Sequence, residues 1–385
     1  MKLRFEAVSR MCSAAVADGA VPGLVVLVGV EGETLFHEAF GARQLAPRRL
    51  PALADTVYDA ASLTKAVVTS VLAMQEVAAG RLALDTPVAT LLPEFSAASQ
   101  GGLHDGARGE ITVRQLLSHA SGLPAHRPFW KQAAHSPAER LAVERLAARE
   151  PLEYPPGTRA VYSDLGFILL GWLLERLTGA RLDVLFHDRI ARPLGLLATT
   201  FVSLADSDAR ARLLGDRTVA ATQVSALRHG LILGEVDDLN AFAMGGIAGH
   251  AGLFATAGEL ATIAGALVRA WRGHEGELDD GGLVAGDVVR QFWSPSGVPG
   301  STWRLGWDGP AASGSQAGEL LSRAAVGHLA FTGCSLWIDP SREVVMVLLA
   351  NRVHPAVPAP TDDRFRRFRP ALHDAALAAL GYDGR

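Results

Sequence analysis

Near the N-terminus, apolar positions first follow a helical spacing and then gather in short β-rich runs. Within residues 5–17 the apolar side chains recur every three or four positions, which predicts an amphipathic helix. Leu24–Val30 and Thr34–Ala39 are typical strand sequences, and Glu31–Glu33 separates them with a central glycine. The pattern therefore predicts a helix followed by a β-hairpin.

A second hairpin is expected near the C-terminus. Ser335–Ile338 and Val344–Leu349 are β-rich, and the turn Asp339–Arg342 joins them. A terminal helix is predicted over Pro370–Leu380, and the arginine-rich run Arg364–Arg369 is interpreted as a solvated face before that helix. Strands at both ends of the chain predict one sheet built from the two termini.

Between these ends the pattern is mostly helical. Ser62–Ala79 has a strong helical periodicity that stops at Gly80, and Ser136 is a candidate N-cap for a helix that Pro137 would open. The clearest further helices are expected at 137–149, 166–178 and 258–270, and polar or glycine-rich loops at 94–110, 272–283 and 294–318. We therefore divide the chain into a sheet region, 1–61 and 284–385, and a mainly helical region, 62–283, an α/β (α+β) arrangement.

Composition excludes several classes of function. The 385 residues are 49% hydrophobic and 20% charged, as in a globular protein, and no apolar run approaches the ~18 residues of a membrane helix. Lys+Arg 36 against Asp+Glu 40 leaves no basic excess for phosphates, so neither a nucleic acid nor a membrane is an expected partner. The N-terminal residues lack a secretory signal pattern, which predicts a cytoplasmic location. The sequence contains no metal-ligand spacing and no nucleotide glycine motif, so no cofactor is expected.

The distribution of lysine draws attention to one position. Lys2, Lys65 and Lys131 are the only lysines, whereas the other strongly basic residues are arginine. Lys65 follows Ser62 by three residues at the start of a predicted helix, so its amine can reach the serine hydroxyl. A desolvated lysine can take the proton of a serine and make it a nucleophile. By itself this spacing is more typical of a capping serine and a solvated lysine.

Two further motifs support the catalytic interpretation. Tyr162 and Asp164 stand two residues apart on a turn that leads into a predicted helix, and Gly327–Gly333 precedes a predicted strand. With Ser62-x-x-Lys65, these segments resemble the Ser-x-x-Lys, Tyr-x-Asn and Lys-Thr-Gly set of the serine β-lactamase and penicillin-binding protein superfamily, most closely its class C and esterase branch. The resemblance continues through 116–124 and 252–257 and covers nearly the whole chain.

This resemblance implies both a fold and a set of roles. It implies an antiparallel sheet from both chain ends, flanked by helices, with a mostly helical middle. Ser62 would be the acylating nucleophile, Lys65 and Tyr162 would share the proton transfers, and the backbone N–H groups of Ser62 and Phe331 would hold the oxyanion. His328, at the lysine position of Lys-Thr-Gly, would be a further catalytic residue, and deacylation could use Tyr162, Lys65 or His328.

Two departures from the family pattern bear on the substrate. Asp164 replaces the usual asparagine, so a carboxylate that favours the protonated form of Lys65 stands where an amide would donate to a substrate carbonyl. His328 replaces a permanent cation with a side chain that is largely neutral at pH 7 unless its pKa is raised. Strong binding of a β-lactam carboxylate is therefore not expected.

Three more segments are similar to a subgroup linked to peptidoglycan breakdown, which includes N-acetylmuramyl-L-alanine amidases. They are 234–241, 245–254 and 351–355. Within them His250 and Arg352 are candidate substrate-binding residues together with Asp164, although a turn histidine and a solvated arginine are the alternatives. Asp237 stands where this subgroup would have a histidine.

The resulting hypothesis is a serine hydrolase that acts on an amide or ester through a Ser62 acyl-enzyme. The preferred substrate is the N-acetylmuramyl-L-alanine bond of muropeptides during wall recycling. A broad-specificity carboxylesterase is the alternative, followed by a β-lactamase or D-Ala peptidase, and a catalytically silent sensor of wall fragments is the alternative outside enzymes. The sequence does not define an oligomeric state.

Overall fold

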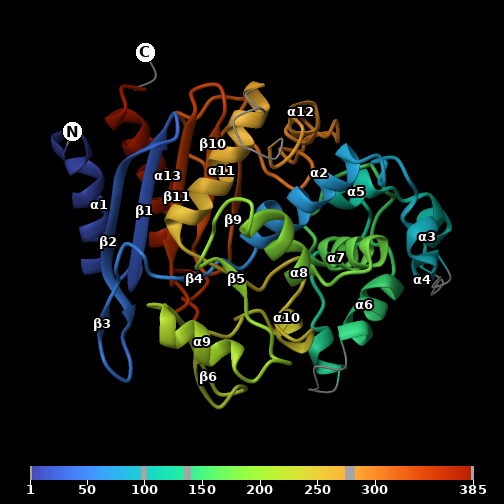
Figure 1. Cartoon of the computed structure of the whole chain (residues 1–385), viewed down its shortest axis with the longest axis horizontal. Coiled ribbons are helices and arrows are strands. Elements are labelled where there is room, and N and C mark those ends of the chain that lie inside the picture. Colours follow the sequence, from blue (N-terminus) through green and yellow to red (C-terminus); the bar gives the residue numbers. More distant parts are fainter. Residues whose placement is uncertain (1, 97–101, 134–139, 274–281, 383–385) are drawn as a thin grey trace.

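The two ends of the chain build one antiparallel sheet with the strand order β3-β2-β1-β11-β10-β9 (Figure 1). This computed structural model describes residues 2–96, 102–133, 140–273 and 282–382. The strands are β1 (Gly23–Val30), β2 (Glu33–Gln44), β3 (Leu50–Pro51), β9 (Val326–Leu329), β10 (Ser335–Asp339) and β11 (Val344–Ala350). N-terminal β1 pairs with C-terminal β11, from Leu24 opposite Ala350 to Val30 opposite Val344. Both predicted hairpins and the shared sheet are confirmed.

Helices cover both faces of this sheet (Figure 1). Because successive strand side chains point to opposite faces, β1 contributes to two cores. Leu24 and Val26 pack in one core with α1 (Glu6–Ala17) and α13 (Arg364–Ala379). Val25 and Leu27 belong to the other core, which includes α11 (Ala257–Arg272). Since α11 lies within the predicted helical region 62–283, that region also supplies a cover for the sheet.

The C-terminal helix begins earlier than the pattern predicts. It starts at Arg364, so Pro370 lies inside it and the arginine-rich run forms its first turns. The prediction that this run precedes the helix is wrong, although Arg364, Arg366 and Arg367 are exposed as predicted. Phe365 is buried beside Gly333, which fixes these turns against the sheet, and Arg369 on the same segment turns toward the protein.

The middle of the chain is mainly helical, as expected. Besides α11, the α-helices described in this region are α2 (Val71–Ala78), α3 (Val88–Leu91), α4 (Pro93–Ser96), α5 (Val113–Leu117), α6 (Arg140–Arg149), α7 (Asp164–Thr178), α8 (Leu182–Phe186), α9 (Ala209–Asp216) and α10 (Leu239–Ala243). Helix α12 (Gly286–Phe292) follows the region. The predicted cap at Ser136 and the helix start at Pro137 lie outside the described residues. The predicted loop at 94–110 contains part of α4 and a 3-10 turn at Asp105–Glu110.

Several short strands between the two hairpins were not predicted. One small sheet has the order β4 (Tyr58–Asp59), β8 (Leu253–Ala255), β5 (Thr200–Phe201), and a second pairs β6 (Ala221–Ser225) with β7 (Gly230–Leu233). Segments of two to five residues are too short to show a reliable period, so the expectation of strands only near the chain ends was wrong. The pairing of β4 with β8 matters because it fixes the chain just before Ser62.

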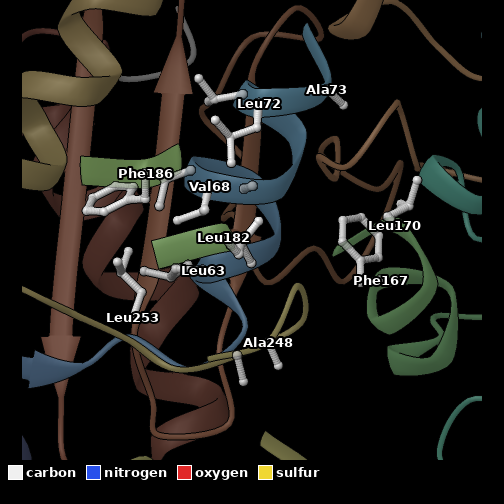
Figure 2. Close-up of a cluster of buried hydrophobic side chains, with 14 of the residues drawn as sticks. Leu63, Val68, Leu72, Ala73, Phe167, Leu170, Leu182, Phe186, Ala248 and Leu253 are labelled. Atoms are coloured by element: carbon white, nitrogen blue, oxygen red, sulfur yellow. The ribbon is translucent and has the colours of Figure 1, made fainter. Parts of the chain in front are cut away.

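The helix after Ser62 is anchored in the larger core. It begins with a π-helical segment, Lys65–Ser70, and continues as α2. The hydroxyl of Ser70 donates to the carbonyl of Lys65 at 2.8 Å across this wider turn. Figure 2 shows Leu63, Val68 and Leu72 along this helix, with Phe167 and Leu170 of α7 beside it. In the described ranges, no helix has the length and apolar character needed to cross a membrane.

Candidate active site

A tight turn presents Ser62 at the start of its helix. Ala61 has a φ of 43°, a strained value for a residue with a side chain, and its N–H donates to Asp59 Oδ1 at 2.8 Å. Asp59 Oδ2 accepts from the N–H of Asp237 at 2.7 Å. Burial raises the pKa of Asp59 to about 7, and nearby Asp237 adds to the effect. The sequence analysis missed this support, because Asp59 and Asp237 are far apart in the chain.

The oxygen of Ser62 accepts two hydrogen bonds from the residues that the family motifs single out. Lys65 Nζ donates to Ser62 Oγ at 3.0 Å, and the hydroxyl of Tyr162 donates to it at 2.8 Å. Lys65 itself is fully buried. The structure therefore brings the three predicted residues into direct contact, although Tyr162 lies 100 positions from Ser62.

Asp164 forms an ion pair with Lys65. Its Oδ1 lies 2.9 Å from Lys65 Nζ, which also donates to the carbonyl of His250 at 2.9 Å and lies 5.0 Å from the centre of the Tyr162 ring. Burial alone would lower the pKa of Lys65, but Asp164 and Tyr162 outweigh burial and raise it. Lys65 is therefore a cation at neutral pH in the free protein.

The N-terminus of α7 places Asp164. Ser163 caps this helix by accepting from the N–H of Gly166 at 3.3 Å, so Asp164 becomes its first residue. His126 Nδ1 lies 3.3 Å from Asp164 Oδ2. Burial would raise the pKa of Asp164, but Lys65 and His126 hold it well below its usual range. The carboxylate is therefore a permanent partner of Lys65.

Aromatic side chains hold the Tyr162 ring. Trp303 stacks on it with centroids 5.4 Å apart, and His119 lies 4.8 Å away. The Nδ1 atom of His119 accepts from the N–H of Ser163 at 3.0 Å, so this buried loop histidine also fixes the Tyr162 backbone. Burial raises the pKa of Tyr162, Lys65 lowers it, and Asp164 raises it again. Trp303, in a predicted loop, carries no sequence signal of this contact.

His328 forms the opposite wall on β9 as a neutral side chain. Its Nδ1 lies 2.7 Å from the carbonyl of Leu329 and so acts as the donor, which leaves Nε2 as the unprotonated atom. Nε2 has no hydrogen-bond partner within the described ranges. Burial, with a contribution from Lys65, lowers the pKa of His328 to about 3. This wall therefore lacks the cation that the Lys-Thr-Gly motif would supply.

The two residues predicted to donate to the oxyanion border a cavity of about 430 Å³ between the walls. Ser62 and Phe331 both line it, together with Tyr162, Asp164 and His328. In the described part of the chain, no acceptor bonds the N–H of Ser62 or of Phe331. A free donor is what an oxyanion hole requires, and the role of these two N–H groups stays a prediction.

The remaining predicted residues occupy different positions. His250 lines the cavity, and its Nε2 lies 2.9 Å from Asp238 Oδ1. Arg352 is not among the residues that line the cavity. Its Nη2 donates to the carbonyl of Phe331 at 3.2 Å, and its N–H donates to the carbonyl of Thr332, so it supports the turn. Substrate contacts by His250 and Arg352 stay predictions.

Arg369 is a residue of this site that the sequence analysis missed. It lines the same cavity from α13. The arginine-rich pattern predicted an exposed surface. The one signal for a buried side of this segment was the apolar residue Phe365, which the structure buries. Among the residues that the structure describes, no three His, Cys, Asp or Glu side chains gather as a metal site would require.

The fold and the serine–lysine–tyrosine contacts together define a serine hydrolase of the β-lactamase type. The family model described as Beta-lactamase matches residues 8–370, so the chain belongs to the β-lactamase family. Relatives include a putative D-alanyl-D-alanine carboxypeptidase of Escherichia coli (strain K12), 30% identical over 363 residues, with 89% of this chain and 81% of that protein covered. The N-acetylmuramyl-L-alanine amidase of Bacillus subtilis (strain 168) is 30% identical over 377 residues, with 94% of this chain and 83% of that protein covered.

A solved structure shows the same fold. The hydrolase EstCE1, described as having promiscuous acyltransferase activity, aligns with a TM-score of 0.71 at 22% identity, covering 96% of this chain and 98% of that one. The predicted fold, a terminal sheet flanked by helices with a helical middle, is thus confirmed, as is membership of the superfamily.

Proposed function

We propose that this protein is an amidase that cleaves the N-acetylmuramyl-L-alanine bond of muropeptides through a Ser62 acyl-enzyme. The observation that carries the catalytic part is the pair of hydrogen bonds from Lys65 and Tyr162 to one serine oxygen. The substrate is supported by the similarity to the Bacillus subtilis amidase over 94% of the chain. The carboxypeptidase relatives share the same reaction class, because both cleave an amide.

The proton must move before Ser62 can attack. In the structure both neighbours donate to Ser62 Oγ, so one of them has to lose its proton to become the base. Loss of the Tyr162 proton gives a phenolate beside the Lys65 cation, which then takes the proton of Ser62 as Oγ bonds to the carbonyl carbon. The N–H groups of Ser62 and Phe331 hold the resulting oxyanion.

Collapse of that intermediate breaks the carbon–nitrogen bond. The amine leaves with the proton held by Tyr162, and an ester between Ser62 and the acyl group remains. Water then adds to this ester and gives its proton to the same base, which releases the acid and restores Ser62. Each step returns Lys65 and Asp164 to the charge state in which the structure shows them paired.

Mass-spectrometric product analysis tests the proposal. A purified N-acetylmuramyl-L-alanyl-D-glutamate fragment is incubated with the wild type and with Ser62→Ala, whose fold is checked by circular dichroism. Release of free N-acetylmuramic acid and free dipeptide by the wild type alone is expected. Equal release by both proteins would contradict Ser62 as the nucleophile, and release by neither would contradict the amidase.

A carboxylesterase is a second candidate because the neutral His328 leaves the β9 wall without the cation of the related motif. Fast hydrolysis of short acyl esters, without muropeptide turnover, would favour it. A catalytically silent sensor predicts instead that a fluorophosphonate adds no mass at Ser62. The cytoplasmic location remains a proposal that cell fractionation would test.

A further inference from the structure

Arg369 presents an unpaired guanidinium to the active-site cavity. It lines that cavity together with Ser62 and His328. Its Nε and Nη1 atoms are shielded from solvent, and no acceptor from residues 2–96, 102–133, 140–273 or 282–382 bonds them. The residue as a whole is half-buried, but two shielded N–H donors without acceptors cost free energy, because their lost hydration is not replaced. A bound anion would replace it.

The groups around Arg369 are positive or neutral. Arg352 and Arg366 lie close enough to affect its ionisation, and the ring of Phe365 lies 5.5 Å from its guanidinium carbon. Burial lowers the pKa of His373, one helical turn further on, to about 3, so that side chain is neutral. Burial also lowers the pKa of Arg369 itself to about 10, which still leaves it charged at neutral pH.

The carboxylates that line the same cavity have other partners. Asp164 pairs with Lys65, Asp238 pairs with His250, and Asp308 accepts from Thr302 and from the N–H of Gly309. None of them forms an ion pair with Arg369. The anion that would satisfy Arg369 therefore has to come from outside the described part of the chain, and the cavity is open to the substrate.

We propose that Arg369 binds a carboxylate of the substrate and makes the enzyme select amides or esters that carry a negative charge near the scissile bond. This inference rests on the proposed acyl-transfer function and narrows its substrate class. A guanidinium presents a planar set of donors that matches a carboxylate, which gives orientation as well as attraction. Because His328 is neutral, Arg369 supplies the positive charge to this wall from a different element of the fold.

Paired esters of matched size test the inference. On the acyl side, the 4-nitrophenyl monoester of glutaric acid is compared with 4-nitrophenyl pentanoate. On the leaving-group side, 3-carboxyphenyl acetate is compared with phenyl acetate. For wild type and Arg369→Gln, kcat/KM is measured for all four. We expect the variant to lose about tenfold or more on the anionic member of at least one pair and to keep the neutral members within about twofold.

Matched variants separate recognition from structure. Arg366→Gln removes an exposed cation from the same helix and should leave all four values unchanged, whereas Arg369→Lys should retain part of the preference. Thermal unfolding of Arg369→Gln should show only a small loss of stability, because the variant removes no hydrogen bond or ion pair that the described residues form and only the ring contact with Phe365. A merely structural Arg369 predicts a larger loss of stability and equal losses on neutral and anionic esters.

The outcomes are distinguishable from failure of the proposed function. Equal losses within each pair, or an unchanged carboxylate preference in Arg369→Gln, would overturn the role of Arg369 while ester hydrolysis by the wild type still supports Ser62 acyl transfer. A wild type that turns over none of the esters and no muropeptide would contradict the function itself.

Discussion

The two walls of the cavity differ in how their polar groups are satisfied. On the helical wall, Ser62, Lys65 and Asp164 form a connected set in which the buried cation has a carboxylate 2.9 Å away. On the sheet wall, His328 Nε2, the N–H of Phe331 and the Arg369 guanidinium have no partner in the described residues. A satisfied set is preorganised for one reaction, whereas unsatisfied donors and acceptors await a ligand. The comparison favours proton transfer at the first wall and contacts with the bound substrate, the oxyanion included, at the second.

The largest effect should follow from breaking the helical wall at Lys65. In Lys65→Met the Asp164 carboxylate loses its cation, and Ser62 and Tyr162 lose the charge that assists proton transfer. We expect a loss in kcat/KM of about 10³-fold or more and a loss of about 3 kcal/mol in the free energy of unfolding. Ester kinetics and urea denaturation measure the two effects.

A double variant separates these contributions. Lys65→Met combined with Asp164→Asn removes the unpaired carboxylate, so most of the stability should return while the activity does not. Recovery of activity together with stability would show that Lys65 acts only by holding the fold.

The next effect is a shift in the pH dependence of Asp164→Asn. Asp164 raises the pKa of both Lys65 and Tyr162, so its removal lets the catalytic base lose its proton at a lower pH. The ascending limb of kcat/KM against pH should therefore move to lower pH by about one unit or more. The assay uses a neutral ester, because ionisation of the substrate would otherwise contribute to the pH profile.

Asp85→Asn is the control for that shift. Asp85 forms an exposed pair with Arg114, so its removal should leave the limb in place. An unmoved limb in Asp164→Asn would mean that neither Lys65 nor Tyr162 limits the reaction on the acid side.

The sheet wall affects the pH dependence of stability, rather than of activity, through His328. Its pKa is about 3 in the folded protein against an ordinary value of 6.5, so the unfolded chain binds a proton that the folded protein does not. Between those pH values this group makes stability fall by about 1.4 kcal/mol for each unit of acidification. The contribution is fully present above about pH 6.5 and is lost as the pH falls.

Comparison of His328→Gln with the wild type isolates this contribution. The variant should show a shallower decline in the free energy of unfolding between pH 6 and pH 4, and an unchanged shape of kcat/KM against pH from pH 5 to pH 8. Equal slopes in the two proteins would contradict a neutral buried His328.

The sequence predicts the residues of the helical wall better than those of the sheet wall. Ser62 and Lys65 are three residues apart, and Tyr162 belongs to a recognisable motif, so local spacing and family resemblance indicate the helical wall. Arg369 and Arg352 are both arginines near the C-terminus, and no local pattern separates the one that lines the cavity from the one that supports the Phe331 turn. That difference depends on where α13 packs against the sheet, which is a tertiary effect.

Secondary structure follows the same rule. The long hairpins and the helix after Ser62 were predicted because their periods extend over many residues. The two-residue strand β4 was missed, although its pairing with β8 helps to set the turn that presents Ser62. Likewise, Pro370 indicated a helix start, but burial of Phe365 extends the helix through it. Tertiary packing overrides local preference at these positions.

The smallest effect on kcat/KM should come from substitution of Arg352. This variant tests whether Arg352 and Arg369 have different roles. Arg352 donates to the carbonyl of Phe331 at the surface, so Arg352→Gln should loosen the turn that carries the Phe331 N–H. Since the proposed oxyanion donor would serve every substrate, kcat/KM should fall by about two- to threefold on neutral and anionic esters alike. A selective loss on the anionic esters would instead place Arg352 in the carboxylate site, as the sequence analysis predicted, and would join the two arginines in one anion-binding surface.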